Sequence, residues 1–508
     1  MVPIVRRGRA FTNMNSRRRS RRISKAPCCA TGFVLGSLFV SLLYLLSLTN
    51  NATFTRQEPS DQQALAKTID IQRCNILTRL SPVELSYVEE IDLKDCNLQS
   101  IPTTIQYATI LRKLDVSNNP LTTLPIELKH CTNLDILFAS SCPSITSLPT
   151  VLGEMPSITR LGWRSGSLSS INPNSLPPNL VHLILTDNKI ETLDDPKIFE
   201  KMKNVRKLML SHNQLKSFGS NGGLEQMQSL ELLRLAGNRL NQIAPQLWEL
   251  PRLAWLTLSG NPITDAFKHQ SQAKKIPYIK MSDLQQAGAS LGEGASGKVQ
   301  LYKWQGKDVA VKLIHGVTSD GKAEDELSIY KLVGSSGVEH RVVGCLALLD
   351  DERKGVVMEP LPSNLDDFAS PPTIVEVTAD RWDLSSTFQA SFVKNALIDA
   401  ATALTFLHSI GVSHGDFYAH NIKVDRTSGR LYLLDFGASY LKGSFATQAE
   451  KVEVRAFGIL VEELSSKLLD PSETNLKDKL VALHEECTDA KVKSRPSFES
   501  IKSKVEAY

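Results

Sequence analysis

The chain has few cysteines, and its folded part carries little net charge. Eight cysteines among 508 residues are too sparse for a disulfide scaffold of the kind that holds small secreted domains together. The formal net charge is +4, but residues 1–27 hold nine basic and no acidic side chains, which leaves the remaining chain at −5. Because phosphate recognition needs a basic face on the folded part, we do not expect a nucleic-acid-binding domain or a nucleic-acid partner.

Long apolar runs are also scarce, and the one that could cross a bilayer lies at residues 28–48. These 21 uncharged residues would form a helix about 30 Å long, which is the thickness of a bilayer core. We interpret them as a transmembrane signal anchor that follows a disordered basic tail (1–27) and precedes a linker or N-terminal cap (49–87). A cleaved signal peptide and a buried core helix are the alternatives.

The membrane orientation is left open by the sequence. The basic tail before a single span would place the N-terminus in the cytosol and the remaining chain in the lumen or outside the cell. An Asn-x-Thr glycosylation triplet at Asn51 agrees with that orientation. The need for ATP, inferred below, favours the cytosol instead. We therefore predict a single-pass membrane protein whose sidedness is unsettled.

Between residues 88 and 267 the sequence repeats a short leucine-rich segment. The template L-x-L-x-x-N/C-x-L has six close and two looser copies, and its Asn or Cys position recurs every 22 to 25 residues. Each L-x-L predicts a short strand whose leucines point into the core while the middle residue faces outward. Eight such repeats predict one curved solenoid. The Asn/Cys positions are Cys96, Asn119, Cys142, Gly166, Asn188, Asn213, Asn238 and Asn261.

The side chain at this position is expected to bond to backbone groups at the turn, in a ladder that runs from repeat to repeat. We accordingly interpret Cys96 and Cys142 as ladder residues and not as disulfide partners or metal ligands. Gly166 has no side chain to contribute, so the fourth repeat should be looser.

The repeats resemble the leucine-rich-repeat family, and the Leu-Pro or Ile-Pro pairs after the turns are similar to those of its intracellular members. The sequence shows no flanking cysteine caps, which favours a reducing compartment. The resemblance implies an α/β solenoid that binds a protein ligand on its concave face, or alternatively a spacer without a ligand. The outward positions expected to contact the ligand include Asp92, Asp115, Arg234 and Thr257.

After a polar linker (268–283), five short motifs follow one another within residues 284–508. A lone G-x-G-x-x-G could suggest a dinucleotide fold, but here it is followed by V-A-V-K at 309–312, which suits a hairpin over nucleotide phosphates. An acidic residue in an amphipathic helical pattern, an H-x-D-x-x-x-x-N segment (414–421) and D-F-G (435–437) complete the set. The residues concerned are Gly292, Gly294, Gly297, Val299, Lys312, Glu326, His414, Asp416, Asn421, Asp435 and Phe436.

In combination these motifs resemble the protein-kinase family, which implies a bilobal α+β domain that uses ATP and Mg²⁺. The resemblance implies that Lys312 holds the α- and β-phosphates and is positioned by Glu326, and that Asn421 and Asp435 bind Mg²⁺. Asp416 would orient the substrate hydroxyl and accept its proton. Val299 and Ala310 would cap the upper face of adenine, which would bond to the backbone near Glu359 and Leu361, with Met358 at the back pocket. Tyr330, His414 and Phe436 would form a regulatory stack.

The kinase pattern has several departures. Gly415 stands where most kinases have Arg, so switching by loop phosphorylation is not expected. Only 18 residues separate Asp435 from Glu453, which replaces the usual Asp, and much of the peptide-docking segment is missing. Lys423 occupies a normally apolar place under the adenine, and Arg495 lacks its usual Glu partner.

We predict a membrane-tethered leucine-rich-repeat protein kinase that phosphorylates a protein hydroxyl, with Ser or Thr favoured over Tyr. Two alternatives remain. A pseudokinase scaffold would bind nucleotide without turnover, and a small-molecule phosphotransferase of the aminoglycoside or choline kinase type would share H-G-D-x-x-x-x-N.

Overall fold

The computed structural model describes residues 74–265, 275–294, 296–318, 320–470 and 474–508. The predicted basic tail (1–27), the membrane span (28–48) and most of the predicted linker (49–87) lie outside the described residues. Among those described, one helix, α7 (Ala390–Ser409), is long and apolar enough to cross a membrane. It packs against α10 and β20 and has many buried residues, as a core helix does.

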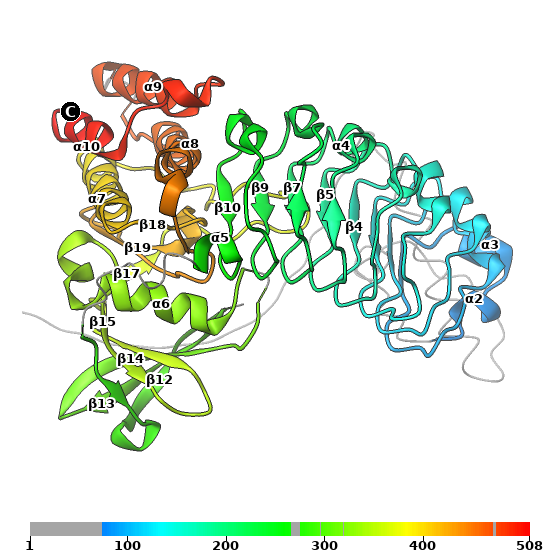
Figure 1. Ribbon diagram of the computed structural model, residues 1–508, viewed down its shortest axis with the longest axis horizontal. Coiled ribbons are helices and arrows are strands. Elements are labelled where there is room, and N and C mark those ends of the chain that lie inside the picture. Colours follow the sequence, from blue (N-terminus) through cyan, green and yellow to red (C-terminus); the bar gives the residue numbers. More distant parts are fainter. Residues whose placement is uncertain (1–73, 266–274, 295, 319, 471–473) are drawn as a thin grey trace, which may run out of the picture. The chain divides into compact units, whose positions relative to one another are not determined.

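The predicted solenoid is confirmed. Eight strands form one parallel sheet in sequence order (Figure 1). Aligned leucines such as Leu114, Leu137 and Leu161 are buried in its core. The strands are β1 (Glu90–Asp92), β2 (Lys113–Asp115), β3 (Ile136–Phe138), β4 (Arg160–Gly162), β5 (His182–Ile184), β7 (Lys207–Met209), β9 (Leu232–Arg234) and β10 (Trp255–Thr257).

Short helices connect the strands, and α2 and α3 precede the first strand while α5 follows the last. Most of them begin at or next to a proline, whose fixed φ suits the first turn of a helix. They are α2 (Ile76–Arg79), α3 (Pro82–Leu85), η2 (Thr103–Tyr107), η3 (Ile126–His130), η4 (Thr150–Glu154), η5 (Pro173–Ser175), α4 (Pro196–Lys201), η6 (Leu224–Gln226), η7 (Pro245–Glu249) and α5 (Pro262–Asp265). A small two-stranded sheet, β6 (Thr192–Leu193) with β8 (Ser217–Phe218), lies between repeats.

An asparagine ladder runs through the turns that follow the strands. The Asn238 Oδ1 accepts the backbone N–H of Leu215 at 3.0 Å, and its Nδ2 donates to the carbonyls of Leu210 and Leu235. Asn119, Asn188, Asn213 and Asn261 repeat this pattern. Each buried amide therefore satisfies backbone groups of two successive repeats.

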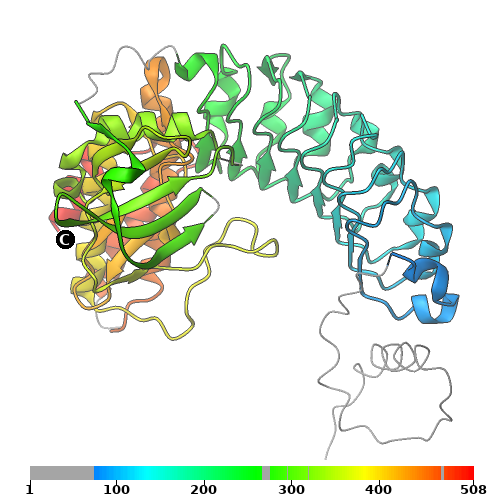
Figure 2. The same ribbon diagram turned by 90° about the horizontal axis from the view of Figure 1, so that it is seen from below.

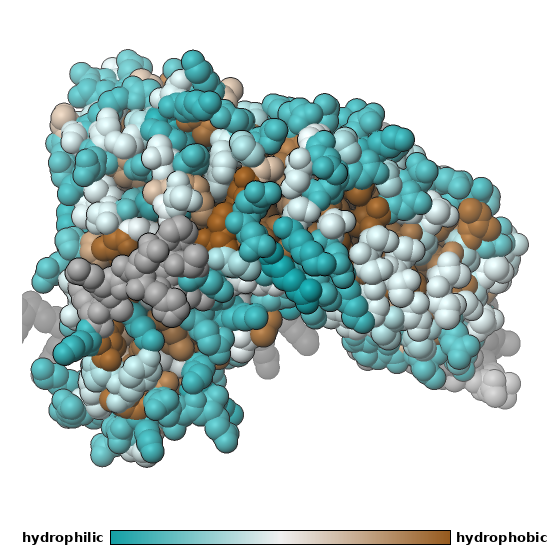
Figure 3. All heavy atoms as spheres, in the orientation of Figure 1, coloured by the Kyte–Doolittle hydropathy of each residue, from teal (hydrophilic) through white to brown (hydrophobic). Residues whose placement is uncertain are grey.

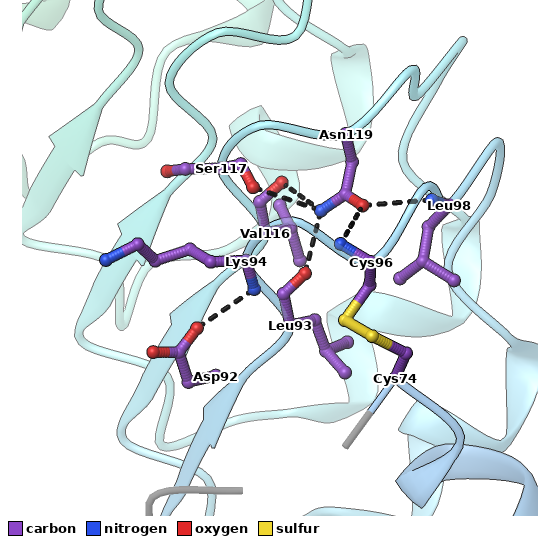
Figure 4. Close-up of a disulfide and its surroundings, with 9 residues drawn as sticks. All are labelled: Cys74, Asp92, Leu93, Lys94, Cys96, Leu98, Val116, Ser117 and Asn119. Atoms are coloured by element: carbon purple, nitrogen blue, oxygen red, sulfur yellow. Dashed lines mark hydrogen bonds between the residues drawn. A yellow bond between two sulfur atoms is a disulfide. The ribbon is translucent and has the colours of Figure 1, made fainter. Parts of the chain in front are cut away.

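The ladder prediction for Cys96 is wrong, because Cys96 forms a disulfide with Cys74 (Figure 4). Cys74 precedes α2, and the Cα atoms of the two cysteines are 5.0 Å apart. The bond therefore ties the cap of α2 and α3 to the first repeat, and the expectation that no cysteine caps the solenoid is corrected as well. Cys142, in contrast, stays a buried thiol that lies 3.6 Å from the carbonyl oxygen of Val116.

A six-stranded sheet forms the smaller lobe of the second domain. Its strand order is β11-β15-β16-β14-β13-β12, and residues of β14 alternate between its two faces. Val309 and Val311 pack in an apolar cluster on one face, while Ala310 belongs to the core on the other face. The elements are β11 (Tyr278–Ile279), η8 (Met281–Asp283), β12 (Gln285–Gly294), β13 (Gly297–Trp304), β14 (Lys307–Ile314), α6 (Ala323–Val333), η9 (Ser335–His340), β15 (Cys345–Leu349) and β16 (Gly355–Met358).

The larger lobe is mainly helical, with short strands that carry the predicted catalytic segments. Helix α7 lies in its core, and α8 packs against α9. The elements are β17 (Leu365–Asp367), α7, β18 (Val412–Ser413), η10 (Ala419–Asn421), β19 (Ile422–Asp425), β20 (Leu431–Leu433), β21 (Tyr440–Leu441), η11 (Gly443–Phe445), α8 (Ala446–Ser465), α9 (Thr474–Thr488), η12 (Val492–Ser494) and α10 (Phe498–Glu506). Hydrophilic residues cover most of the surface in the view of Figure 3.

The end of the solenoid packs directly on the larger lobe, and all described residues belong to one compact unit. Leu232 of β9, Trp255 of β10 and Ala254 just before β10 join the apolar core that includes α7 and α8. Arg234 and Thr257, predicted to be exposed for a partner, are buried there with 4% and 0% of their surface exposed. That part of the partner prediction is wrong, because the chain's own second domain covers these two positions.

A segment of the larger lobe, residues 368–388, also extends toward the solenoid, as the yellow loop in Figure 2. Arg160 of β4 donates to the carbonyls of Ile374 and Val375, and Arg206 donates to the hydroxyl of Thr378. These bonds hold the segment along the outward-facing residues of the middle repeats.

Candidate active site

Three ionisable side chains meet between the lobes. The Lys312 Nζ lies 2.6 Å from Glu326 Oε1 and 3.0 Å from Asp435 Oδ1. Lys312 points from β14 toward α6, which carries Glu326 one turn from its start, and Asp435 follows β20. The structure therefore brings together the lysine and the two carboxylates that the sequence singled out.

The charges of this cluster depend on one another. Burial by itself would lower the pKa of Lys312, but the carboxylates of Asp435 and Glu326 outweigh it and raise this pKa. Burial would raise the pKa of Asp435, but Lys312 and the N–H of Gly437 hold it well below its usual range. The ammonium and the Asp435 carboxylate are thus both charged near neutral pH.

Asp435 is held in a constrained backbone conformation. Its φ of +58° lies in the left-handed region, which a non-glycine residue adopts at a cost. Besides the bond to Lys312, its carboxylate accepts the Gly437 N–H at 3.0 Å and the Ser296 hydroxyl at 2.8 Å. Ser296 lies in the turn between β12 and β13, so the glycine-rich hairpin contacts the D-F-G segment directly.

The three predicted glycines lie in this hairpin. Gly297 needs to be glycine, because a Cβ there would lie 2.4 Å from the carbonyl oxygen of Leu313 on the neighbouring strand. A Cβ on Gly292 or Gly294 would meet nothing within 4 Å. These two positions therefore have open space beside them.

The predicted adenine-contacting residues lie on the adjoining strands. Val299 is paired with Lys312, and Ala310 with Met358 at the end of β16. Glu359 and Leu361 follow directly after that strand, the first exposed and the second half-buried. The structure thus places Val299 and Ala310 on neighbouring strands, with the other two residues in the connection between the lobes.

The predicted catalytic loop has a bonded core. The Asn421 Nδ2 donates to the carbonyl oxygen of Asp416 at 2.8 Å and to its Oδ2 at 3.1 Å. Asn421 also accepts the Leu434 N–H through its carbonyl, and Leu434 accepts a bond from the His414 ring. The loop is therefore joined to the strand that leads to Asp435.

Glu453 and the aromatic stack of Tyr330, His414 and Phe436 contact this loop. The buried Glu453 carboxylate, which lies about two turns inside α8, accepts the N–H groups of His414 and Gly415. The Phe436 ring contacts Tyr330 at 4.9 Å and His414 at 5.8 Å between ring centroids. All three members of the predicted stack are in contact.

Two other residues that depart from the kinase pattern, Arg495 and Lys423, have polar partners in the structure. The Arg495 guanidinium, which lacks its usual Glu, donates to the carbonyls of Asp489, Lys451 and, in the solenoid, Pro251. The Lys423 Nζ lies 2.9 Å from Asp367 Oδ1.

Sequence reasoning missed the residues that the solenoid contributes to the site. The Arg234 Nη2 lies 2.5 Å from Asp416 Oδ1, and its Nη1 donates to the Gly415 carbonyl. The Trp255 indole donates to the carbonyl of Phe417 and stacks on the ring of Tyr418 at 4.1 Å. The signal that the sequence offered was the presence of a large basic residue, Arg234, and a large aromatic residue, Trp255, in the strands predicted for the last two repeats.

Comparisons with known proteins agree with this division of the chain. Residues 286–454 match the protein kinase domain family, and residues 111–131 and 178–240 match two leucine-rich-repeat families. A probable serine/threonine-protein kinase of Dictyostelium discoideum is 30% identical over 181 residues, which is 35% of this chain and 10% of that protein.

Two further relatives match the chain over 280 and 206 residues. A second probable serine/threonine-protein kinase of Dictyostelium discoideum is 25% identical over 280 residues, covering 47% of this chain and 25% of its own length. Human leucine-rich repeats and immunoglobulin-like domains protein 3 is 25% identical over 206 residues, which is 40% of this chain and 16% of that protein. The chain thus spans a quarter or less of these curated relatives.

Proposed function

The chain carries leucine-rich repeats followed by a protein kinase domain, and from this we propose that it transfers the γ-phosphoryl group of ATP to a protein hydroxyl, Ser or Thr in preference to Tyr. The observation that supports this most directly is the bonded set of Lys312, Glu326 and Asp435 beside Asp416 and Asn421. Phosphoryl transfer is catalysed chiefly by positioning and by neutralising charge, and this set offers both.

Each group has a distinct proposed part. Lys312, kept charged and oriented by Glu326, binds the α- and β-phosphates. Asp416 orients the acceptor hydroxyl and takes its proton as the new bond to phosphorus forms. The glycine-rich hairpin covers the phosphates. Val299 and Ala310 cap the upper face of adenine, which bonds to the backbone near Glu359 and Leu361.

The donor set fits Mg²⁺. The Asp435 carboxylate and the Asn421 carboxamide supply hard oxygens, and Mg²⁺ is usually held by one or two carboxylates together with substrate phosphates. No group of three or more His, Cys, Asp or Glu suited to a metal occurs among the described residues. These two residues would hold the ion, which neutralises phosphate charge when bound.

Loss of turnover on mutation tests this proposal. Purified full-length chain should transfer labelled phosphate from Mg-ATP to protein, and Asp416→Asn and Asp435→Ala should each reduce the rate by about 10²-fold or more. Asp366→Asn, at an exposed position on β17, is the matched control and should keep wild-type activity.

The two alternatives give other results. Wild type that is as inert as Asp435→Ala, yet gains thermal stability with ATP, would indicate a pseudokinase scaffold. Transfer to choline or an aminoglycoside in place of protein would indicate a small-molecule phosphotransferase.

We further propose that the span at 28–48 tethers the protein to a membrane. The Cys74–Cys96 disulfide supports the lumenal or extracellular orientation, since disulfides persist in oxidising compartments. Protease protection of sealed vesicles, together with a glycosidase-sensitive mass shift at Asn51, tests this. Full digestion by external protease in cytosol-side-out vesicles would place the domains in the cytosol.

Protein-ligand binding by the solenoid is proposed for its N-terminal strands. Asp92 and Asp115 are only half-buried there, whereas the outward residues of the last strands contact the kinase domain. Loss of a captured ligand with Asp92→Ala and Asp115→Ala, but an unchanged kinase rate, would be the expected result.

A further inference from the structure

Arg234 connects three places in the structure through a single guanidinium. It is the last residue of β9, and only 4% of its surface is exposed. Its Nε lies 2.9 Å from Asp320 Oδ1, its Nη1 donates to the Gly415 carbonyl at 3.1 Å, and its Nη2 lies 2.5 Å from Asp416 Oδ1. All three nitrogens of its rigid fork are therefore used.

The neighbouring solenoid residues hold the same two loops. Thr257, paired with Arg234 on the next strand, donates its hydroxyl to the carbonyl of Asp320 at 3.3 Å. Trp255 on that strand binds the catalytic loop two residues beyond Gly415, as described above. The solenoid thus contacts the catalytic loop and the loop before α6 through adjacent strands.

Gly415 stands where most kinases have an arginine. Its φ is +75°, and a Cβ there would lie 2.6 Å from the carbonyl oxygen of Ala438, directly after the D-F-G segment, and 2.7 Å from that of Leu256 in β10. A side chain at this position would therefore clash with the second domain itself as well as with the solenoid. The basic group beside Asp416 comes instead from the solenoid.

We propose that Arg234 is a positioning residue for the phosphoryl transfer, which the solenoid supplies to the kinase domain. This inference rests on the proposed kinase function. Arg234 holds the Asp416 carboxylate in place from one side while Asn421 holds it from the other. Through Asp320 it also fixes the loop that leads into α6, and α6 carries the Glu326 that orients Lys312.

The contact leaves Asp416 able to act. A carboxylate offers about four acceptor sites, and the bonds from Arg234 and Asn421 occupy two of them. The Asp416 side chain keeps 17% of its surface exposed. The Lys312–Glu326 pair and the Phe436 stack are also fully formed in the presence of this contact. These observations favour a positioning contact over an inhibitory one.

Kinase assays on full-length Arg234 variants test the proposal. Arg234→Ala should lower kcat about 10–100-fold, because a small displacement of a positioned group costs that much, while KM for ATP should change little. Arg234→Lys should be intermediate, since one ammonium cannot bond to all three acceptors. Arg239→Ala, an exposed arginine of the same repeat, is the matched control and should retain activity.

Rescue by the conservative variant separates positioning from a merely structural effect. The folded fraction of each variant is measured first, and kcat is then compared per folded molecule. Arg234→Lys keeps a cation next to the Asp416 carboxylate and should recover part of the kcat that Arg234→Ala loses, whereas a simple loss of folded protein would leave the kcat per folded molecule unchanged in both variants.

The outcomes are distinguishable. An inactive wild type would overturn the kinase proposal and this inference together. An active wild type with an equally active Arg234→Ala would overturn only the inference, and a higher kcat in Arg234→Ala would overturn it by showing an inhibitory contact. Should Arg234→Ala fail to fold in a thermal melt, Arg234→Lys decides: a kcat per folded molecule below that of wild type supports positioning, and an unchanged kcat refutes it.

Discussion

The Cys74–Cys96 disulfide should set the local stability of the solenoid's N-terminal end. The bond joins residues 22 positions apart and encloses α2, α3 and β1. Closing a loop of this length removes chain entropy from the opened state worth about 3 kcal/mol. Because every 1.4 kcal/mol is a factor of ten, reduction should raise the opening constant of this end by about 100-fold.

Hydrogen exchange in the full-length chain measures this effect. Amides of β1 and β2 should exchange about 100-fold faster after a reductant is added, while those of β9 and β10, far along the sheet, should not change. Cys74→Ser should match reduced wild type and should not respond to the reductant. The described free cysteines are buried, so their thiols should not interfere.

Equal exchange in the oxidised and reduced chain would refute the reasoning. It would mean that the cap is already open, or that the bond is absent from the protein in solution. Mass spectrometry after alkylation without reductant distinguishes these two cases, since a bonded pair is protected from alkylation.

Three other predictions follow from buried contacts. Asn238→Ala should lower the free energy of unfolding, measured with denaturant, by about 2–4 kcal/mol, because it leaves buried backbone groups without a hydrogen-bond partner. Asn241→Ala, at an exposed position, should lower it by less than about 0.5 kcal/mol, and equal losses would contradict the ladder. Burial would lower the pKa of His420, but its bond to Asp380 raises it above the usual value. That stabilisation is complete below the unfolded-state pKa and is lost as pH rises through the folded-state pKa, so Asp380→Asn should destabilise more near pH 5.5 than near pH 9, as unfolding at both pH values would show. Trp255→Phe should cost about 1 kcal/mol and Trp255→Ala about 3–5 kcal/mol; equal losses in thermal melts would mean that ring stacking contributes nothing.

Much of the fold could be read from the sequence because its signals are local. A leucine at every second position of a strand, repeated at a period near 24 residues, needs nothing beyond side-chain alternation and stacking to become a solenoid. The kinase motifs also kept their order, so that Lys312, Glu326 and Asp435 could be named as partners before any distance between them was known.

The pairing of Cys96 could not be read in the same way. Cys96 occupies a position that Asn occupies in five other repeats, so the ladder interpretation fitted its spacing. The deciding fact is that α2 and α3 fold back on the first repeat and bring Cys74 next to it. That proximity depends on packing of the cap, which has no repeat pattern to predict it.

The sequence by itself determined which ionisable and polar side chains this protein has and which predicted strand, helix or loop carries them. It placed Arg234 facing outward from β9, and that was correct. Only the tertiary structure decided that this outward face meets the catalytic loop, because the docking of solenoid on kinase joins segments about 180 residues apart. Such a contact depends on the complementarity of two already folded surfaces, and neither surface leaves a periodic or spaced signal in the chain.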